Sequence, residues 1–311
     1  MTATTPLSTR GNIAARAAMA SVAMATMLLG LKVWAAVSTG SVAMLGSLAD
    51  TALDLIASLV TLFGVWVAAQ PADHDHRFGH GKAEALAALF QTMLISISAA
   101  WIAWRAVVRL QAPVAPEAPE LGICVSLIAM VATLALVAYQ RRAVKRTGSI
   151  AIQTDQLHYQ SDLLLNAAVI AALALDRFAG LLGADAIFGL LIAVYLAWGA
   201  ARAARHAIDM LMDKEWDDAR RAQITAIVAA HPIVHGLHEL KTRTSGATDF
   251  IQFHVWVDGE MTVTKAHDVV DELEDAVAAA FPGAEILIHV DPAGHSERYF
   301  TATGTEKLQP A

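Results

Sequence analysis

The sequence has little cysteine and little charge. Its single cysteine, Cys124, lies in an apolar run, so we expect no intrachain disulfide framework and no cysteine-based zinc site. Only 16% of the 311 residues are charged, against about 25% in soluble globular domains. Because 56% of the residues are hydrophobic and the mean hydropathy is +0.48, the composition indicates a membrane protein.

Two sequence signals are also missing. No cleavable signal peptide is expected, because the apolar run that follows residues 1–10 is too long and has no small-residue cleavage pattern. A His-Glu-x-x-His motif, which an intramembrane metalloprotease needs for hydrolysis, does not occur. We expect a protein that is not an enzyme, and nothing in the composition indicates a nucleic-acid partner.

Six apolar segments are long enough to be compared with the roughly 20 residues that a helix needs to cross a bilayer. They run over about 12–36, 42–69, 84–108, 121–140, 150–175 and 185–209. All six are expected to be helices, since an unpaired backbone cannot cross lipid. The sequence therefore predicts a polytopic α-helical membrane protein, with a six-helix domain over 12–213 after a short N-terminal tail, 1–11.

The basic residues of the loops predict the orientation. They gather near the start of the first segment and after the second, fourth and sixth: Arg10, Arg16, Arg77, Lys82, Arg141, Arg142, Lys145, Arg146, Arg202, Arg205 and Lys214. The loops on the opposite side are poor in lysine and arginine. By the positive-inside rule, both termini lie in the cytoplasm.

The stretch 214–292 has the pattern of a small soluble domain. Helices are expected over 217–230 and 263–281, and strands over 234–244, 248–257 and 285–290. This αββαβ order predicts a cytoplasmic α+β domain with one antiparallel sheet and helices on one face. Residues 293–311 are polar and have no periodicity, so a mobile tail is expected there.

Four polar side chains interrupt two of the apolar segments. Asp50 and Asp54 are four residues apart, as are His158 and Asp162, so each pair shares one helix face. Ionised side chains are costly inside a bilayer and usually lie on a substrate pathway. Three carboxylates and one imidazole form a tetrahedral ligand set for a divalent transition metal. The alternative is that the two aspartates contact water at a helix end while the other pair bonds to neighbouring helices.

The loop after the second segment offers another set of ligands. Asp73, His76 and His80 are spaced so that a compact turn closes them on one metal ion. A solvated cytoplasmic loop whose histidines bind no metal is an equally good interpretation of these residues.

The soluble domain contains a third group of candidate ligands. His289 and Asp291 share one face of a strand, His254 lies on a neighbouring strand, and His267 lies on the polar side of a helix beside Asp271. With His238, these residues indicate a carboxylate-bridged binuclear site. A lone histidine on a strand is more often structural, which is the alternative here.

These motifs together resemble the cation diffusion facilitator family of bacterial zinc and iron exporters. The resemblance covers about 12–292 and rests on four motifs: Asp50-x-x-x-Asp54, Phe78-Gly79-His80-Gly81-Lys82-Ala83-Glu84, His158-x-x-x-Asp162 and His289-x-Asp291-Pro292. It implies a homodimer in the bacterial inner membrane with six transmembrane helices and an αββαβ cytoplasmic domain. It also implies exchange of a cytoplasmic divalent metal for protons.

The resemblance implies roles for individual residues. The transport site is Asp50, Asp54, His158 and Asp162; the loop site is Asp73, His76 and His80; the zinc cluster of the cytoplasmic domain is His238, His254, His267, His289 and Asp291. Lys82 and Asp213 match positions that form charge contacts near the cytoplasmic hinge of the dimer.

From these residues we expect a proton-coupled antiporter that exports divalent metal from the cytoplasm. One imidazole with carboxylates suits zinc, cadmium or ferrous iron, and the absence of a cysteine site argues against cuprous ion. The metal is therefore the transported substrate, with protons as the counter-substrate and zinc as a further structural or regulatory ion. The alternative is a membrane-bound metal sensor that binds without transporting.

Overall fold

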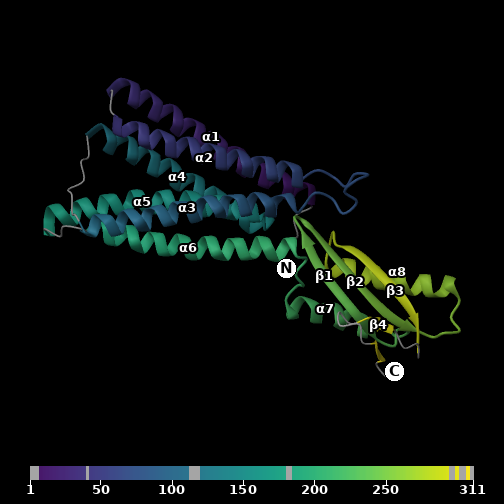
Figure 1. Cartoon of the computed structure of the whole chain (residues 1–311). Helices are drawn as coiled ribbons and strands as arrows, with labels where there is room; N and C mark the ends of the chain where they lie inside the picture. Colours follow the sequence, from purple (N-terminus) through teal and green to yellow (C-terminus); the bar gives the residue numbers. More distant parts are fainter. Residues whose placement is uncertain are drawn as a thin grey trace. The chain divides into compact units, whose positions relative to one another are not determined.

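The computed structural model describes residues 7–39, 42–111, 120–179, 184–293, 298–300 and 306–308. The chain divides into two compact units, Met1–Met212 and Asp213–Ala311. The first unit is helical and the second contains the sheet (Figure 1).

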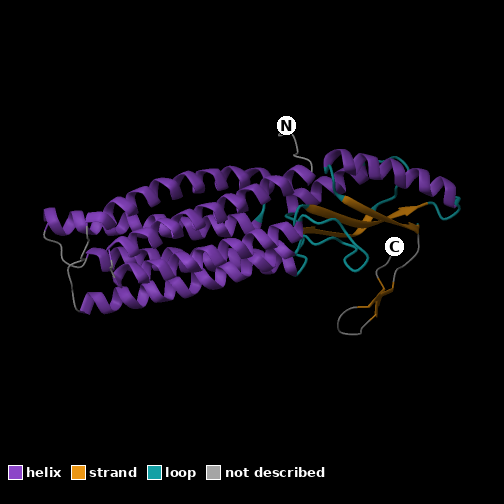
Figure 2. Ribbon diagram, turned by 90° about the horizontal axis from the view of Figure 1, so that it is seen from above, coloured by secondary structure: helices purple, strands orange, loops and turns teal. Residues whose placement is uncertain are grey.

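Six long helices form the first unit, one for each apolar segment that the sequence predicted. They are α1 (Leu7–Thr39), α2 (Val42–Ala68), α3 (Ala83–Gln111), α4 (Glu120–Thr147), α5 (Ile150–Ala179) and α6 (Ala184–Leu211). They run side by side as a bundle, in which α3 packs most extensively against α6, and α1 against α2 (Figures 1 and 2). Large hydrophobic side chains such as Phe63, Trp101 and Trp198 are exposed on its outside, as expected of a surface that faces lipid.

The fifth helix differs from the other five in polarity. Helices α1, α2, α3, α4 and α6 each contain a described segment long and apolar enough to cross a membrane. Helix α5 is 30 residues long but does not meet this criterion within the described residues, because it contains Asp155, His158 and Asp162. It packs against α3, α4 and α6 within the same bundle. The six-helix fold is therefore confirmed, with α5 packed among the other helices of the bundle.

Small side chains bring the helices close together. Ala14, Ala17, Ala18, Ala87 and Ala151 are buried where the helices pack, each at most 4% exposed. Gly64 of α2 lies so near α3 that an added Cβ would stand 2.5 Å from the Cβ of Ala87. Close packing through small residues is the usual way in which membrane helices associate.

The second unit follows the predicted αββαβ order. It contains α7 (Asp218–Ala229), β1 (Leu237–Ser245), β2 (Thr248–Val257), α8 (Val263–Ala280) and β3 (Glu285–Pro292). Both helices begin at a capping side chain: Asp217 accepts a hydrogen bond from the backbone N–H of Arg220, and Thr262 accepts one from that of Lys265. Each cap satisfies a backbone donor that has no partner within its helix.

The sheet is mixed, and the expectation of an antiparallel sheet was wrong. The strand order is β1-β2-β3, with β1 antiparallel to β2 and β2 parallel to β3. The physical reason is α8, which carries the chain back along the sheet before β3 starts. A strand–helix–strand connection returns the chain in its original direction, whereas a tight turn reverses it.

One face of the sheet is covered and the other carries polar groups. Ile251, Phe253 and Val255 of β2 are buried in one cluster with Ile224 of α7 and Leu273 of α8. Side chains alternate along a strand, so the even-numbered neighbours of these β2 residues, including a histidine, point to the opposite face. The helices therefore lie on one face, as predicted, and the other face is left for the histidines.

Most of the expected tail, 293–311, lies outside the described residues. Within it the structure describes two short strands, β4 (Arg298–Phe300) and β5 (Glu306–Leu308), which pair antiparallel. No pattern in the sequence predicted this pairing.

The contact at Gly64 yields a first prediction. We expect Gly64→Ala to lower the thermal stability of the purified protein, because its new methyl group overlaps that of Ala87 and the two helices must separate. The matched control is Gly30→Ala on α1, where an added Cβ meets no atom within 4 Å. This control should be neutral or stabilising by up to about 1 kcal/mol, since alanine favours helices over glycine. Equal melting temperatures for the two variants would contradict the close contact.

Candidate metal sites

Three groups of potential metal ligands occur in the described part of the chain. In each, three His or Asp side chains place one ligand atom apiece within 4.8 Å of one another: Asp54, His158 and Asp162; Asp73, His76 and His80; His238, His254 and Asp291. Each group belongs to one of the sites that the sequence suggested.

The first group, called the membrane group here, consists of Asp54, His158 and Asp162 and joins α2 to α5. The Nε2 atom of His158 lies 3.0 Å from Oδ1 of Asp54, and Asp162 follows one helical turn after the histidine. The side chain of His158 is 12% exposed and that of Asp54 23%, so the group is shielded from water without being sealed from it. Two carboxylates and an imidazole at this separation form a nitrogen–oxygen donor set for a divalent metal.

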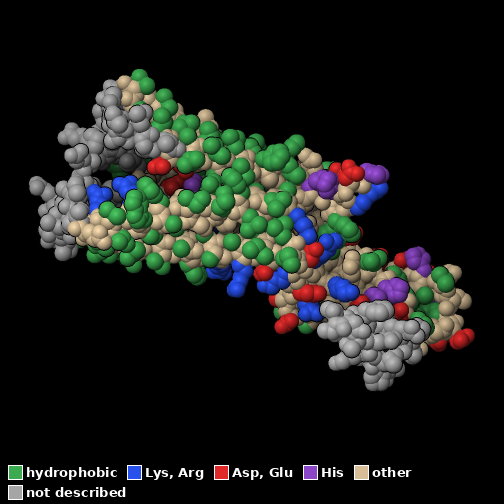
Figure 3. All heavy atoms as spheres, in the orientation of Figure 1, with side chains coloured by type: hydrophobic (Ala, Val, Ile, Leu, Met, Phe, Trp, Pro, Cys, Tyr) green, Lys and Arg blue, Asp and Glu red, His purple; other side chains and the backbone are tan. Residues whose placement is uncertain are grey.

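Asp50 lies apart from this group but lines the same cavity. The cavity has a volume of about 390 Å³ and is lined by Asp50, Asp54, His158 and Asp162. Asp50 itself is exposed and is not one of the three converging ligands. Figure 3 shows acidic and histidine side chains recessed in a hollow of the helical unit, among hydrophobic side chains. The structure thus brings three of the four predicted residues to one point and the fourth to the cavity wall.

Asp155, a buried carboxylate that was not predicted from the sequence, lies on α5 about one turn before His158. Asp155 of α5 is completely buried and accepts three hydrogen bonds: from Ser21 Oγ at 2.5 Å, from Gln91 Nε2 at 2.7 Å and from Gln140 Nε2 at 2.7 Å. The donors come from α1, α3 and α4. A second bond links Gln91 to Thr61 of α2. This buried network therefore connects the first five helices.

Tyr159 extends the network toward the membrane group. Its hydroxyl donates to the backbone carbonyl of Ser21 at 3.1 Å and lies 2.9 Å from the hydroxyl of Ser58. Its ring makes an edge contact with the neighbouring His158. The polar residues Gln91 and Gln140 inside apolar segments were the signal for this network, because an unpaired amide in the membrane is costly.

The N-terminus of α5 is held by a second buried carboxylate. Glu84 of α3 is 9% exposed and accepts a hydrogen bond from Ser149 Oγ at 2.7 Å, directly before α5 begins. A carboxylate at this end of a helix is favoured by the unpaired backbone N–H groups and by the helix dipole. Together, Glu84 and Asp155 fix the helix that carries His158 and Asp162.

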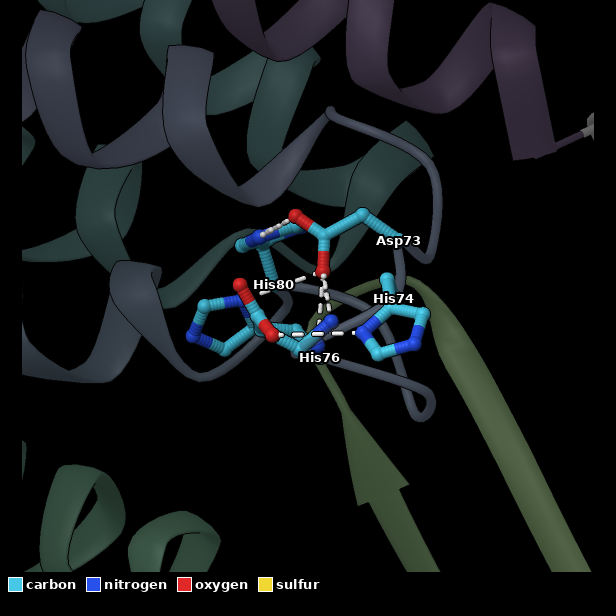
Figure 4. A network of polar contacts seen from close by, with 5 residues as sticks. Asp73, His74, His76 and His80 are labelled. Carbon is cyan, nitrogen blue, oxygen red and sulfur yellow. Dashed lines mark hydrogen bonds and ion pairs between the residues drawn. The ribbon is translucent and has the colours of Figure 1, made fainter.

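The loop group lies in a compact turn between α2 and α3 (Figure 4). Oδ1 of Asp73 lies 3.2 Å from Nδ1 of His76, and its Oδ2 lies 3.3 Å from Nε2 of His80. The backbone N–H of His76 donates to Asp73 at 2.6 Å and holds the pKa of that carboxyl below its ordinary value. Gly79, at φ +75, allows the turn that directs His80 back toward Asp73.

The exposure of the loop group differs among its members. Asp73 is 51% exposed and His76 60%, whereas His80 is 12% exposed. The Nδ1 atom of His80 is buried and has no hydrogen-bond partner among the described residues. One carboxylate and two imidazoles, including this buried Nδ1 atom of His80, form a donor set that fits zinc. The compact turn is the one that the sequence predicted.

The third group lies on the uncovered face of the sheet. His238, His254 and His289 are direct neighbours across β1, β2 and β3 in the strand register. Oδ2 of Asp291 lies 3.0 Å from Nδ1 of His254 and 3.3 Å from Nε2 of His238, while its Oδ1 lies 3.2 Å from Nε2 of His289. The carboxylate thus contacts three imidazoles through its two oxygens, as a bridging ligand does.

His267 does not join this cluster within the chain. It lies on α8, is 71% exposed, and its Nε2 atom is 3.7 Å from Asp271. Glu239, which the sequence analysis did not select, lies 3.8 Å from His254. The register of β1 shifts between His238 and Lys241, and Glu239 has φ +48. No repeating sequence pattern marks such a bulge in advance.

The two expected hinge residues have partners within their own units. The Nζ atom of Lys82 donates to the backbone carbonyl of Leu211 at 3.2 Å, which links the start of α3 to the end of α6. Asp213 lies 3.4 Å from Arg243 on β1. Their role in a dimer stays a prediction.

Two family models match the chain. The cation efflux transmembrane domain matches residues 18–212, and the cytoplasmic domain of cation efflux proteins matches residues 216–293. Both matched ranges agree with the two units of the fold.

Relatives match the chain over most of its length. It is 44% identical over 282 residues to the cation-efflux pump FieF of Klebsiella pneumoniae, covering 91% of this chain and 94% of that one. It is 46% identical over 276 residues to FieF of Pectobacterium atrosepticum, covering 89% and 92%. The metal-bound C-terminal domain of the CzcD transporter from Thermotoga maritima is 29% identical, with a TM-score of 0.25, over 25% of this chain and 93% of that one.

The Asp155 network yields a second prediction. We expect Asp155→Leu to lower the free energy of unfolding by about 3 kcal/mol or more, because buried donors on three helices lose their acceptor. Thermal unfolding of the purified protein measures this effect. Asp155→Asn keeps one acceptor oxygen and should cost less. Ser96→Ala, which removes only a bond to the backbone of its own helix, is the control and should change little.

Proposed function

This chain belongs to the cation efflux family, also called cation diffusion facilitators, and we propose that it exports zinc from the cytoplasm in exchange for protons. The family is one of divalent metal transporters and not an enzyme class. Zinc as the metal and protons as the counter-substrate are part of the proposal. The observation that carries it is the convergence of Asp54, His158 and Asp162 in one cavity of the helical unit.

Asp50 completes the proposed transport site. It lines the cavity on the same helix as Asp54, one turn away on the same helix face, so its carboxylate is placed to complete the ligand set. Three carboxylates and one imidazole then give four ligands, the number that zinc prefers. Such a ligand set is closed and holds zinc tightly, so release requires a competitor.

Protons are the proposed competitor. Carboxylates and imidazole bind metal only when deprotonated, so protonation and metal binding exclude each other at the same atoms. His158 is the first candidate to accept the proton, because imidazole changes charge near physiological pH. Metal would bind on the cytoplasmic side and leave on a more acidic outer side.

The arrangement of the helices supports alternating access. With both termini in the cytoplasm, as the loop charges favour, the cavity lies in the outer half of the bundle and contains an exposed Asp50. The bonds of Asp155 to Ser21 and Gln140 then lie on the cytoplasmic side of the site. We infer an outward-open state in which this network closes the inner path.

The loop and cytoplasmic groups are proposed to hold resident metal. Asp73, His76 and His80 would bind one ion, and His238, His254, His289 and Asp291 would bind ions bridged by the aspartate. A bound ion would tie the loop ends or the three strands together and neutralise the carboxylates. His267 and the hinge pair, Lys82 and Asp213, are proposed to act in a homodimer, as the family's cytoplasmic domain suggests.

Flux through the membrane group gives the third prediction. Purified protein reconstituted in liposomes should carry zinc in response to an imposed pH gradient, and Asp54→Ala should reduce this flux at least about a hundredfold, because one ligand of the site is lost. The control is Asp218→Ala, a fully exposed aspartate of α7, which should keep the flux of the unmodified protein.

The same assay separates transport from sensing. If the unmodified protein binds zinc but carries none, while a related exporter does so in the same liposomes, the sensor alternative is correct. If flux occurs but does not respond to the pH gradient, the protein transports metal without proton exchange.

Metal selectivity gives the fourth prediction. We expect His158→Asp to shift the transport preference from zinc toward manganese, because an all-oxygen site suits harder ions. Competition of manganese with radioactive zinc in liposomes measures the preference. An unchanged ratio of the two ions would place selectivity outside this group of residues. His206→Asp on α6, an exposed histidine outside the cavity lining, is the matched control.

A further inference from the structure

A lysine lies in the wall of the proposed transport cavity. Lys32 of α1 lines the cavity together with Asp50, Asp54, His158 and Asp162. Among the described lining residues, no other lysine or arginine occurs. Lys32 is not among the site residues predicted from the sequence. A single lysine near the end of an apolar segment has an ordinary explanation.

That ordinary explanation does not fit the contacts of Lys32. A lysine near the end of a membrane helix usually extends its ammonium group to the lipid headgroups. Here the side chain is partly buried, and Nζ donates to Oγ1 of Thr51 at 2.6 Å. Thr51 is 2% exposed and lies on α2 between Asp50 and Asp54. The ammonium group is therefore directed into the bundle, beside the carboxylates.

The charges in the cavity balance only when Lys32 is counted. Asp50, Asp54 and Asp162 carry three negative charges when ionised, and a neutral His158 adds none. The ammonium group of Lys32 lowers this total to two negative charges, which one divalent cation neutralises. In a low-dielectric interior a net charge is costly, so the neutral loaded cavity is favoured over one that keeps an unbalanced charge.

We propose that Lys32 is a specificity-determining residue of the transport site, whose fixed charge matches the three aspartates to one divalent cation. This proposal rests on the proposed function and adds to it. Lys32 does not ligate the metal. It repels each bound cation in proportion to the charge of that cation, so it weakens the binding of a trivalent ion more than that of a divalent one.

The same repulsion has a consequence for turnover. A site with four anionic or basic ligands and no fixed cation would hold zinc tightly and release it slowly. Lys32 destabilises the loaded state relative to the empty one, which favours release. Its bond to Thr51 keeps the ammonium group at the cavity without placing it on a ligand atom.

The test compares binding and flux in a background where the other two groups cannot bind. Asp73→Ala and Asp291→Ala remove the shared carboxylates of the loop and cytoplasmic groups from the full-length protein. In this background, Lys32→Gln removes the charge and Lys32→Arg keeps it. Lys32→Met is a second neutral variant in case the first does not fold. Arg205→Gln, which removes an exposed charge of α6 outside the cavity lining, is the control.

We expect Lys32→Gln to bind zinc at least about tenfold more tightly and to carry it more slowly at saturating zinc. Because the Coulomb interaction scales with ion charge, a tenfold gain for zinc corresponds to a gain of about thirtyfold for terbium(III). Competition of terbium with zinc measures this ratio. Lys32→Arg and Arg205→Gln should keep the ratio of the background protein.

Two results would overturn the proposal. One is a neutral Lys32 variant that binds both ions as the background protein does. The other is a change of the same size in Lys32→Arg, which would make the shape of the lysine responsible and not its charge. Absence of zinc flux in the unmodified protein is a different result, since it contradicts the proposed function itself.

Discussion

A carboxylate inside a membrane bundle must have hydrogen-bond donors, and Asp155 shows how this constraint organises the fold. Its two oxygens accept bonds from α1, α3 and α4, while the aspartate itself belongs to α5. In lipid no water can replace a missing donor, so the helices must keep the arrangement that supplies all three. Helix α5, which carries this carboxylate, is consequently held by specific hydrogen bonds from three other helices.

The same constraint explains why the proposed metal ligands lie where they do. Asp155, His158 and Asp162 are three and four residues apart, so they lie on one inward-facing stripe of α5. At the start of this stripe, the carboxylate of Asp155 accepts three hydrogen bonds and is fixed by them. At the other end of the stripe, His158 and Asp162 line the cavity, where a metal ion or protons can balance their charge. One helix face thus holds a structural carboxylate and a proposed metal ligand.

The sequence predicted these elements well wherever one local pattern determined the outcome. The six helices follow from the length of apolar segments, and the four-residue spacing of Asp50–Asp54 and His158–Asp162 follows from helical geometry. The strand 248–257 was predicted at its observed bounds because hydrophobic and polar residues alternate along it. The parallel β2–β3 pairing, the bulge at Glu239 and the donors of Asp155 depend on contacts between distant segments, which no local spacing encodes.

The three ligand groups differ in how they are supported, and this difference bears on their tasks. The cytoplasmic group lies on three hydrogen-bonded strands, with its histidines in register, so its geometry is set by the sheet. The loop group depends on one turn that Asp73 closes by accepting backbone N–H groups, a local structure that a bound ion would reinforce. The membrane group alone is shared between two helices, α2 and α5. A site that must bind and release its ion on opposite sides needs ligands that can separate, and only helices that move relative to one another provide this. If the membrane group is the transport site, as we propose, the balance of carboxylates, Lys32 and cation therefore decides on which side the ion stays.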